Sequence, residues 1–239
     1  MTARQLAAAV ALLAAFATNA RAETYPSRSV TILTPFAAGS VTDAAARLIA
    51  QSLQDTLGQP FVVENRAGAG GLLAASAVAR AQSDGYTLLL TTNSTHSAAN
   101  GLFKSVPYDP IKDFTPIARI GSFPSFVAVH PSLPINSMQE LVAYAKANPG
   151  KLSYGVGNST GQITGETIKK RTGIEVVRVN YRSNPAALTD LVAGHIQMMI
   201  PDYNTGLAQV KAKTIRPLAV LTKDRNPALP DVPTLSETV

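Results

Sequence analysis

Two turns in this sequence combine glycine with small polar residues, as anion-binding turns do, and the first spans residues 35–43. It lies between a short β-rich run and a helical pattern, so it is expected to hold the unpaired backbone N–H groups of a helix N-terminus. These amides, with the partial positive charge of the helix end, can bind a carboxylate or phosphate without a cationic side chain. The alternative is a capping box formed by Ser40 and Asp43, which would begin the helix without binding a ligand.

The second turn, residues 155–162, places the same chemistry in the later half of the chain, and here Ser159 and Gln162 have capping-box spacing. Two such turns facing one cleft would hold an anion between two helix N-termini. A polar loop at residues 93–97 follows a predicted strand and would add hydroxyl and amide groups at the carboxyl edge of the sheet. Asp202 follows another predicted strand, and its side chain is expected either in the cleft or as the N-cap of the next helix.

The motifs of other chemistries are incomplete. The glycines at 68–71 and 155–157 do not complete a dinucleotide fingerprint, and no glycine-rich run leads into the Gly-Lys-Ser/Thr of a phosphate loop. The chain has no cysteine and its three histidines are far apart, so we expect no metal ligands and no cofactor. No Gly-x-Ser-x-Gly elbow is present, and no catalytic residue is assigned. The enzymatic alternative is an exported α/β hydrolase or lyase that uses His96 with Ser94 or Ser159.

Alternating strand and helix patterns predict an α/β architecture, with a parallel sheet in the first half of the chain. In the first half, strands and helices are expected to alternate over residues 30–33, 44–57, 61–63, 72–81 and 86–91. In the second half, extended segments at 117–120 and 126–129 precede alternating helices and strands over residues 141–147, 152–154, 161–172, 174–179, 185–193, 196–200, 203–212 and 216–221. Two such units would form a bilobal protein with a ligand cleft between the lobes.

The first 22 residues have the pattern of an export signal. Arg4 precedes an apolar stretch over residues 6–17, and Ala20-Arg21-Ala22 has the small-x-small pattern of a signal-peptidase site. A buried N-terminal helix is the alternative, but the stretch is too uniformly apolar to have a polar face. Cleavage after Ala22 is therefore expected, with export from a bacterial cell.

Composition and charge exclude several classes of protein. Of the 239 residues, 15% are charged, and beyond the leader no apolar run reaches the roughly 18 residues of a membrane-spanning helix. The 16 glycines and 16 prolines are scattered, which argues against a disordered or collagen-like chain. Loss of Arg4 and Arg21 with the leader lowers the formal net charge from +6 to +4, and the remaining cations are dispersed. Nucleic-acid binding is therefore not expected.

Several motifs, each modest alone, follow one another along the chain. They are Pro-Phe-Ala-Ala-Gly at 35–39, Glu-Asn-Arg-Ala-Gly-Ala-Gly-Gly at 64–71, Asp-Gly-Tyr-Thr-Leu at 84–88, Tyr-Asp-Pro at 108–110 and Asn-Tyr-Arg at 180–182. In this order and spacing the chain resembles the substrate-binding receptors of tripartite tricarboxylate transporters, the Bug family. The resemblance covers residues 25–239, and its most specific part is the pair of motifs at 64–71 and 84–88.

The resemblance implies a two-lobed receptor in the periplasm of a Gram-negative bacterium, with the type II binding-protein (Venus-flytrap) fold. The implied first lobe is residues 23–117 with a return segment at 219–239, and the implied second lobe is residues 118–218. Receptors of this family continue well beyond a Pro-Thr-Leu segment like the one at 233–235, whereas this chain ends at Val239. The sequence therefore predicts a truncated chain with an incomplete first lobe, whose uncovered apolar surface would leave that lobe poorly stabilised.

The resemblance also implies a site and a function. In the family the two lobes close around a small carboxylate, which sits between the turn after the first strand and the corresponding turn of the second lobe, partly through ordered waters. The ligand would pass to the membrane components of a tripartite transporter, and the receptor is expected to be a monomer. The residues expected to bind the ligand are Phe36, Ala37, Ala38, Gly39, Ser40, Asn93, Ser94, Thr95, Gly157, Asn158, Ser159, Thr160, Gln162, Tyr181 and Asp202.

Three departures from the family pattern leave the identity of the ligand open. Ser40 stands where a second glycine is common, Gln162 where a histidine is frequent, and Ser183 where glycine usually follows Tyr-Lys/Arg. The ligand is therefore expected to be a di- or tricarboxylate, an amino acid or an aromatic acid. A non-functional fragment with only a structural or interaction role is a third hypothesis, beside the receptor and the enzyme.

Overall fold

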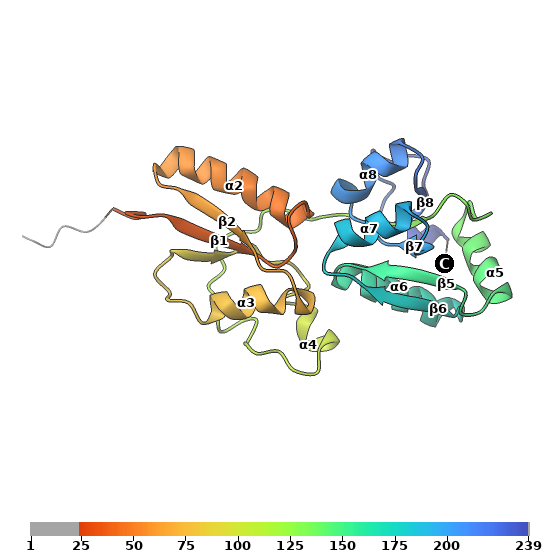
Figure 1. Cartoon of the computed structure of the whole chain (residues 1–239), viewed down its shortest axis with the longest axis horizontal. Helices are drawn as coiled ribbons and strands as arrows, with labels where there is room; N and C mark the ends of the chain where they lie inside the picture. Colours follow the sequence, from red (N-terminus) through yellow and green to blue (C-terminus); the bar gives the residue numbers. More distant parts are fainter. Residues whose placement is uncertain (1–23, 239) are drawn as a thin grey trace, which may run out of the picture.

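The computed structural model describes residues 24–238, which form two α/β units lying side by side along the long axis of the molecule (Figure 1). The predicted export signal, residues 1–22, lies outside the described residues. The first unit holds a three-stranded sheet and the second a five-stranded sheet, and the chain passes between them through residues 115–125. None of the helices in the described part has the length and hydropathy that crossing a membrane requires.

The first sheet is parallel throughout, as the alternating pattern predicts, with the strand order β2-β1-β3. Ala46 and Ala50, one helical turn apart on α2, pack against Val30, Ile32 and Phe61 of the sheet. This packing fixes the N-terminus of α2 just beyond the carboxyl end of β1. The elements of this unit are β1 (Val30–Thr34), α2 (Val41–Leu57), β2 (Phe61–Asn65), the 3-10 turn η1 (Ala69–Gly71), α3 (Leu72–Ala79), β3 (Thr87–Leu89) and α4 (Ala99–Leu102).

The second sheet is mixed, with the strand order β6-β5-β7-β4-β8. Its elements are β4 (Phe126–Val129), α5 (Met138–Ala147), β5 (Leu152–Val156), α6 (Ser159–Thr172), β6 (Val176–Asn180), α7 (Asn184–Val192), β7 (Met198–Met199), α8 (Tyr203–Lys211), β8 (Arg216–Val220) and the 3-10 turn η2 (Leu235–Glu237). β5 pairs in parallel with β6 and β7, whereas β4 is antiparallel to β7 and β8. This sheet is mixed because β4 enters it from the inter-unit segment and not from a helical crossover.

Helices cover both faces of the second sheet, and β4 lies between two apolar cores (Figure 1). Val127 and Val129 pack in the core beneath α5 and α6. Phe126 and Ala128, whose side chains point to the opposite face, pack with α7 and α8. The second unit is thus a three-layered sandwich whose carboxyl-end loops face the first unit.

The final described residues lie on the second unit, not on the first. Leu229 and Val232 pack in the core that holds α7 and α8, and Leu235 packs against the opposite core. The amide of Val220 donates to Pro233 O at 2.8 Å, so the chain returns after β8 and lies parallel to the end of that strand. The predicted return of residues 219–239 to the first lobe is therefore wrong for the residues that the structure describes.

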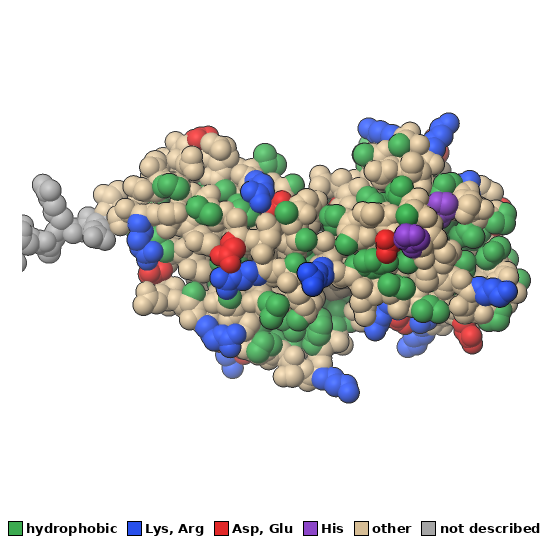
Figure 2. Space-filling view, viewed as in Figure 1, with side chains coloured by type: hydrophobic (Ala, Val, Ile, Leu, Met, Phe, Trp, Pro, Cys, Tyr) green, Lys and Arg blue, Asp and Glu red, His purple; other side chains and the backbone are tan. Residues whose placement is uncertain are grey.

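Two surface features bear on the sequence predictions. The segment 117–120 forms no strand, and Ile117 and Ile120 are 80% and 58% exposed. Figure 2 shows Lys and Arg scattered over both units on the face that it displays, without a gathered basic patch.

Candidate functional site

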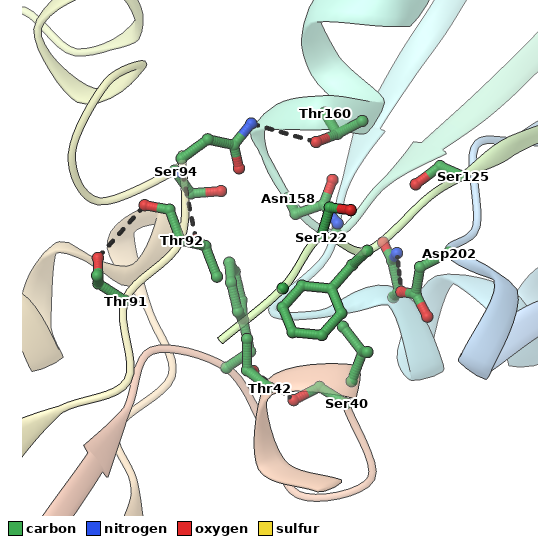
Figure 3. A pocket seen from close by; sticks show the side chains of 17 residues that line it. Ser40, Thr42, Thr91, Thr92, Ser94, Ser122, Ser125, Asn158, Thr160 and Asp202 are labelled. Atoms are coloured by element: carbon green, nitrogen blue, oxygen red, sulfur yellow. Dashed lines mark hydrogen bonds between the residues drawn. The ribbon is translucent and has the colours of Figure 1, made fainter. Parts of the chain in front are cut away.

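A cavity of about 290 Å³ lies between the two units (Figure 3). It is bordered by the N-termini of α2 and α6, by the loop after β3 and by the inter-unit segment. This volume corresponds to roughly ten water-sized groups, which is the scale of a small metabolite. The lining residues are Phe36, Ser40, Val41, Thr42, Thr91, Thr92, Asn93, Ser94, Gly121, Ser122, Phe123, Ser125, Gly157, Asn158, Thr160, Asn184 and Asp202.

Side chains of the first glycine turn accept hydrogen bonds from amides of the same turn. Ser40 is the N-cap of α2, and its Oγ accepts a hydrogen bond from the amide of Asp43 at 3.3 Å. Asp43 Oδ2 accepts from the amide of Gly39 at 3.0 Å. The Gly39 amide, which the sequence assigns to the ligand, is thus engaged within the turn, because the carboxylate four residues later points back to it.

Asn65 and Asp43 hold the turn against β2. Asn65 Nδ2 donates to Asp43 Oδ1 and to the backbone oxygen of Phe36, both at 3.0 Å. Arg47 Nε donates to Asp43 Oδ2 at 3.2 Å. Burial opposes ionisation of Asp43, but the hydrogen bonds from Arg47, Gly39 and Asn65 outweigh it and lower the pKa of the carboxyl. Asn65, from the motif at 64–71, therefore positions the turn.

The amides that remain at this turn belong to Val41 and Thr42, the first two residues of α2. Both residues line the cavity, and neither amide has an acceptor within residues 24–238. The first N–H groups of a helix have no partner within the helix, so a ligand or water must satisfy them. The donors on this side of the cavity lie just beyond the predicted Ala38 and Gly39.

At the second turn the N-cap of α6 is Asn158 and not Ser159. Asn158 Oδ1 accepts from the amide of Gly161 at 2.9 Å. The amide of Thr160 has no acceptor within the described chain, and Thr160 lines the cavity. The second turn therefore presents the Thr160 amide to the cavity without a protein acceptor, whereas the Gly161 amide is bound by the N-cap.

Gly157 allows this turn to approach the N-terminus of α7. A Cβ at Gly157 would overlap the backbone N of Asn184 and the backbone C of Ser183. The requirement for glycine here is one of space, because the two backbone segments are in direct contact. This contact brings Asn184 to the wall of the cavity.

Hydrogen bonds join the loop after β3 to the N-terminus of α6. Ser94 Oγ lies 2.8 Å from Ser159 Oγ and accepts from the amide of Ser159 at 3.2 Å, and this contact is buried. Asn93 Nδ2 donates to Thr160 Oγ1 at 3.3 Å (Figure 3). The first amide of α6 therefore meets a hydroxyl of the other unit, and these bonds hold the two units together beside the cavity.

Asp202 lies in the wall of the cavity and is also the N-cap of α8. Its Oδ1 accepts from the amide and the hydroxyl of Thr205 at 2.9 and 2.8 Å. Its Oδ2 accepts from Asn184 Nδ2 at 2.8 Å. Asp202 therefore lies in the wall of the cavity and caps α8 at the same time, which are the two alternatives that the sequence leaves open. Asp202 is 3% exposed and is the one charged side chain in the lining.

His96 belongs to a hydroxyl network behind the cavity wall. Its Nδ1 lies 2.6 Å from Thr91 Oγ1 and 3.1 Å from Thr95 Oγ1. The ring packs on Phe114 with 4.7 Å between centroids. Burial lowers the pKa of His96, because it disfavours the charged imidazolium.

The structure brings together about half of the residues predicted to bind the ligand. Those in the lining are Phe36, Ser40, Asn93, Ser94, Gly157, Asn158, Thr160 and Asp202. Those outside it are Ala37, Ala38, Gly39, Thr95, Ser159, Gln162 and Tyr181. The Tyr181 hydroxyl donates to Asp190 Oδ2 at 2.6 Å, and the Thr95 hydroxyl to the backbone oxygen of Thr92 at 3.1 Å, so both are used within their own units. That the lining residues bind a ligand stays a prediction.

The remaining lining residues were not predicted from the sequence, namely Val41, Thr42, Thr91, Thr92, Gly121, Ser122, Phe123, Ser125 and Asn184. Thr91 ends the predicted third strand and Thr92 follows it, and the rule that ligands bind beyond strand carboxyl ends would have included them, since β3 itself ends at Leu89. Val41 and Thr42 were missed because the helix was expected to begin at residue 44, whereas α2 begins at Val41 and its unpaired amides lie there. The inter-unit segment has no local signal, because only the packing of the two units brings it to the cavity.

Residues 45–239 match the model of the tripartite tricarboxylate transporter family receptor. The chain belongs to this family. BugT of Bordetella pertussis is 36% identical over 227 residues, which are 94% of this chain and 70% of BugT. The resemblance to the Bug receptors that the sequence motifs indicate is thereby confirmed.

Solved structures of similar proteins agree with the fold. A protein of R. palustris solved with adipate is 39% identical, with a TM-score of 0.86 over 90% of this chain and 72% of that chain. MatC of Rhodopseudomonas palustris, solved with bound malate, is 30% identical, with a TM-score of 0.84 over 90% of this chain and 74% of that chain. The predicted two-lobed α/β periplasmic-binding-protein fold is confirmed, and the chain is a solute receptor of the tripartite transporter family.

Proposed function

We propose that this receptor captures a small organic carboxylate in the cavity between its two units and delivers it to the membrane components of a tripartite transporter. The observation that carries the proposal is the position of the cavity between the N-termini of α2 and α6, in a chain of this receptor family. The adipate and malate of the two solved relatives are ligands of this chemical class.

Neutral donors hold the carboxylate. The lining residues include no Lys, Arg or His. The open amides of Val41, Thr42 and Thr160 are the donors at the two helix ends, and Ser94, whose hydroxyl contacts Ser159, lines the same cavity. Helix dipoles strengthen hydrogen bonds from such amides to an anion, so a cationic side chain is not required.

The two units act as lobes that close on the ligand. The first lobe ends near residue 117, and the second runs from 118 through the described C-terminal residues, as their packing on the second sheet supports. Hydrogen bonds such as that between Ser94 and Ser159 form across the lobes when they are closed. A ligand that touches both lobes only in the closed form shifts that population by the free energy of these extra contacts and no more.

The receptor works as a monomer in the periplasm after export and cleavage after Ala22. The leader pattern of residues 1–22 supports export. The family of receptors to which the chain belongs supports the compartment and the membrane partner.

The site binds its ligand without catalysing a reaction. The enzymatic alternative needs His96 within hydrogen-bonding reach of Ser94 or Ser159, as base and nucleophile. In the structure His96 Nδ1 contacts threonine hydroxyls, and the two serine hydroxyls bind each other. This arrangement supports a binding protein, and the alternative predicts turnover that is lost in His96→Ala while ligand affinity survives.

Isothermal titration calorimetry of residues 23–239 tests the proposal. The panel comprises malate, adipate, aspartate and an aromatic acid, with glucose and a polyamine as controls. We expect one-site binding by at least one acid and no binding by either control. Binding of glucose or the polyamine, with no heat from any acid, would contradict the proposal.

Two variants at one position test the role of the amide. Thr160→Pro removes the N–H at the second residue of α6, where the proline ring is compatible with the first helical turn. Thr160→Ala is the matched control, because it loses the hydroxyl and keeps the amide. We expect Thr160→Pro to bind the acid about tenfold more weakly than Thr160→Ala, the effect of one hydrogen bond to a charged group. Equal affinities of the two variants would exclude this amide from the site.

A further inference from the structure

Acceptor groups gather on one side of the cavity. Figure 3 shows Asp202 beside Ser125, away from Thr91 and Ser94 on the opposite side. The open donors belong instead to the first turns of α2 and α6. A ligand that fills the cavity therefore meets open amide donors at the two helix ends and a buried acceptor at the wall that Asp202 forms.

Asp202 has the properties of an acceptor for a ligand as well as those of a helix cap. Its side chain is 3% exposed and is the one charged group among the lining residues. Oδ2 accepts one hydrogen bond, from Asn184, and a carboxylate oxygen can accept two. A second carboxylate placed near this buried charge would be repelled strongly, since little water separates them.

Asn184 adds a second acceptor at the same place. Its Nδ2 donates to Asp202, which fixes the orientation of the amide and leaves Oδ1 as an acceptor. Within the described chain Oδ1 has no hydrogen-bond partner, and the residue is 4% exposed. A buried acceptor without a donor is unfavourable, so a donor on the ligand, or a water held by that donor, would stabilise this wall.

We propose that the ligand carries a hydroxyl or ammonium group that faces Asp202, in addition to the carboxylate held at the helix ends. The receptor then prefers hydroxy or amino acids to unsubstituted acids of the same length. This inference rests on the proposed function and names the substrate class of the same site. Asp202 supplies the selectivity through its negative charge, and Asn184 keeps that carboxylate in position.

Matched acids and one isosteric variant test the inference. Succinate, L-malate and L-aspartate share a four-carbon diacid skeleton and differ by a hydrogen, a hydroxyl or an ammonium at one carbon. Adipate and 2-aminoadipate form a longer pair. Affinities are measured by calorimetry with the wild-type chain and with Asp202→Asn, which keeps an oxygen that can cap α8. Ser137→Ala, which removes the cap of α5 outside the cavity lining, is the control for lost stability.

In the wild-type chain we expect the substituted acid of at least one series to bind about tenfold more tightly than the unsubstituted acid. In Asp202→Asn the difference should shrink to within about threefold, and Ser137→Ala should keep it. Equal wild-type affinities within both series would overturn the inference, and so would a preference that Asp202→Asn leaves unchanged, since Asp202 would then act only as a cap. Binding of any acid upholds the proposed function. No binding by all five would overturn the inference alone, because the proposed function is decided by the wider panel that includes an aromatic acid.

Discussion

Asp43 is the residue on which the shape of the first turn depends most. Its buried carboxylate accepts hydrogen bonds from the Gly39 amide, Asn65 and Arg47. We expect Asp43→Asn to lower the free energy of unfolding by about 1–3 kcal/mol at pH 7, because buried donors lose a charged acceptor. Denaturant titration followed by circular dichroism measures the change. Asp55→Asn, on the exposed face of the same helix, is the control and should change stability little.

The contribution of Asp43 also has a defined pH dependence. Burial opposes its ionisation, but the hydrogen bonds from Arg47, Gly39 and Asn65 prevail and lower its pKa in the folded state. A lowered pKa means that the ionised carboxylate stabilises the fold, fully above the unfolded value of about 4 and progressively less as the pH falls through the folded value. The stabilities of wild type and Asp43→Asn should therefore differ at pH 7 and converge below about pH 4. A difference that widens towards low pH would contradict this interpretation.

Gly157 and Gly161 lie in the same turn region, but only Gly161 should tolerate substitution by alanine. A Cβ at Gly157 would overlap backbone atoms of Ser183 and Asn184, which cannot move without displacing α7. A Cβ at Gly161 would have its nearest neighbour at 3.6 Å, and alanine is favoured over glycine within a helix. We expect Gly157→Ala to lose at least about 2 kcal/mol of stability together with ligand binding, and Gly161→Ala to keep both. Thermal unfolding measures the stability of the two variants, and calorimetry measures their ligand binding. Equal stability and equal binding of the two variants would refute the packing argument.

At the scale of the elements, the bonds between the loop after β3 and α6 should set how readily the lobes close. Ser94→Ala removes the hydroxyl that receives the Ser159 amide and leaves this buried amide without its partner. We expect ligand affinity to fall about fivefold to tenfold, since closure includes these bonds. Ser97→Ala, an exposed serine of the same loop, is the control and should bind like the wild type. Small-angle scattering without ligand should show a larger average radius for Ser94→Ala, and an unchanged radius with unchanged affinity would contradict the role of these bonds.

Helix starts show what local sequence can and cannot predict. Ser137 and Glu140 have capping-box spacing, and Ser137 is the N-cap of α5. The same rule selected Ser159 for α6, but Asn158 is the cap and the Ser159 hydroxyl binds Ser94, 65 positions earlier in the chain. Two adjacent residues can both cap a helix, and a distant partner decides between them. Such a choice is not encoded in the local pattern.

The alternation of strands and helices predicted most elements, because each depends on periodicity within a short window. The antiparallel entry of β4 was not predicted, since strand direction depends on how the chain crosses between units. The same contrast between local pattern and the packing of the two units applies to the candidate site. Loops after strands and before helices were found, whereas Gly121 and Phe123 reach the cavity only through the docking of the two units.

At the scale of the whole molecule, the two units differ in how much apolar surface they bury. The second has an extensive core on each face of a five-stranded sheet. The first has smaller cores around three strands, and Leu48 and Leu73 are 75% and 56% exposed. Figure 2 shows hydrophobic side chains gathered at the surface of the first unit over α3 and α4.

This asymmetry predicts that the first unit of this chain opens more readily than the second. Local stability follows the density of buried apolar contacts. Hydrogen exchange of the chain under native conditions should therefore show faster exchange in β1, β2 and β3 than in β4, β5 and β8. Equal protection of the two sheets, or greater protection of the first, would contradict the prediction.

The proposed receptor function depends on a carboxylate held by backbone amides at two facing helix ends. The most direct measurement is a crystal structure of residues 23–239 with the acid that binds most tightly in calorimetry. We predict that the acid lies in the inter-unit cavity, with carboxylate oxygens in hydrogen-bonding distance of the amides of Val41, Thr42 and Thr160. An acid bound elsewhere, or held there by Lys or Arg side chains while these amides bond to protein atoms, would contradict it.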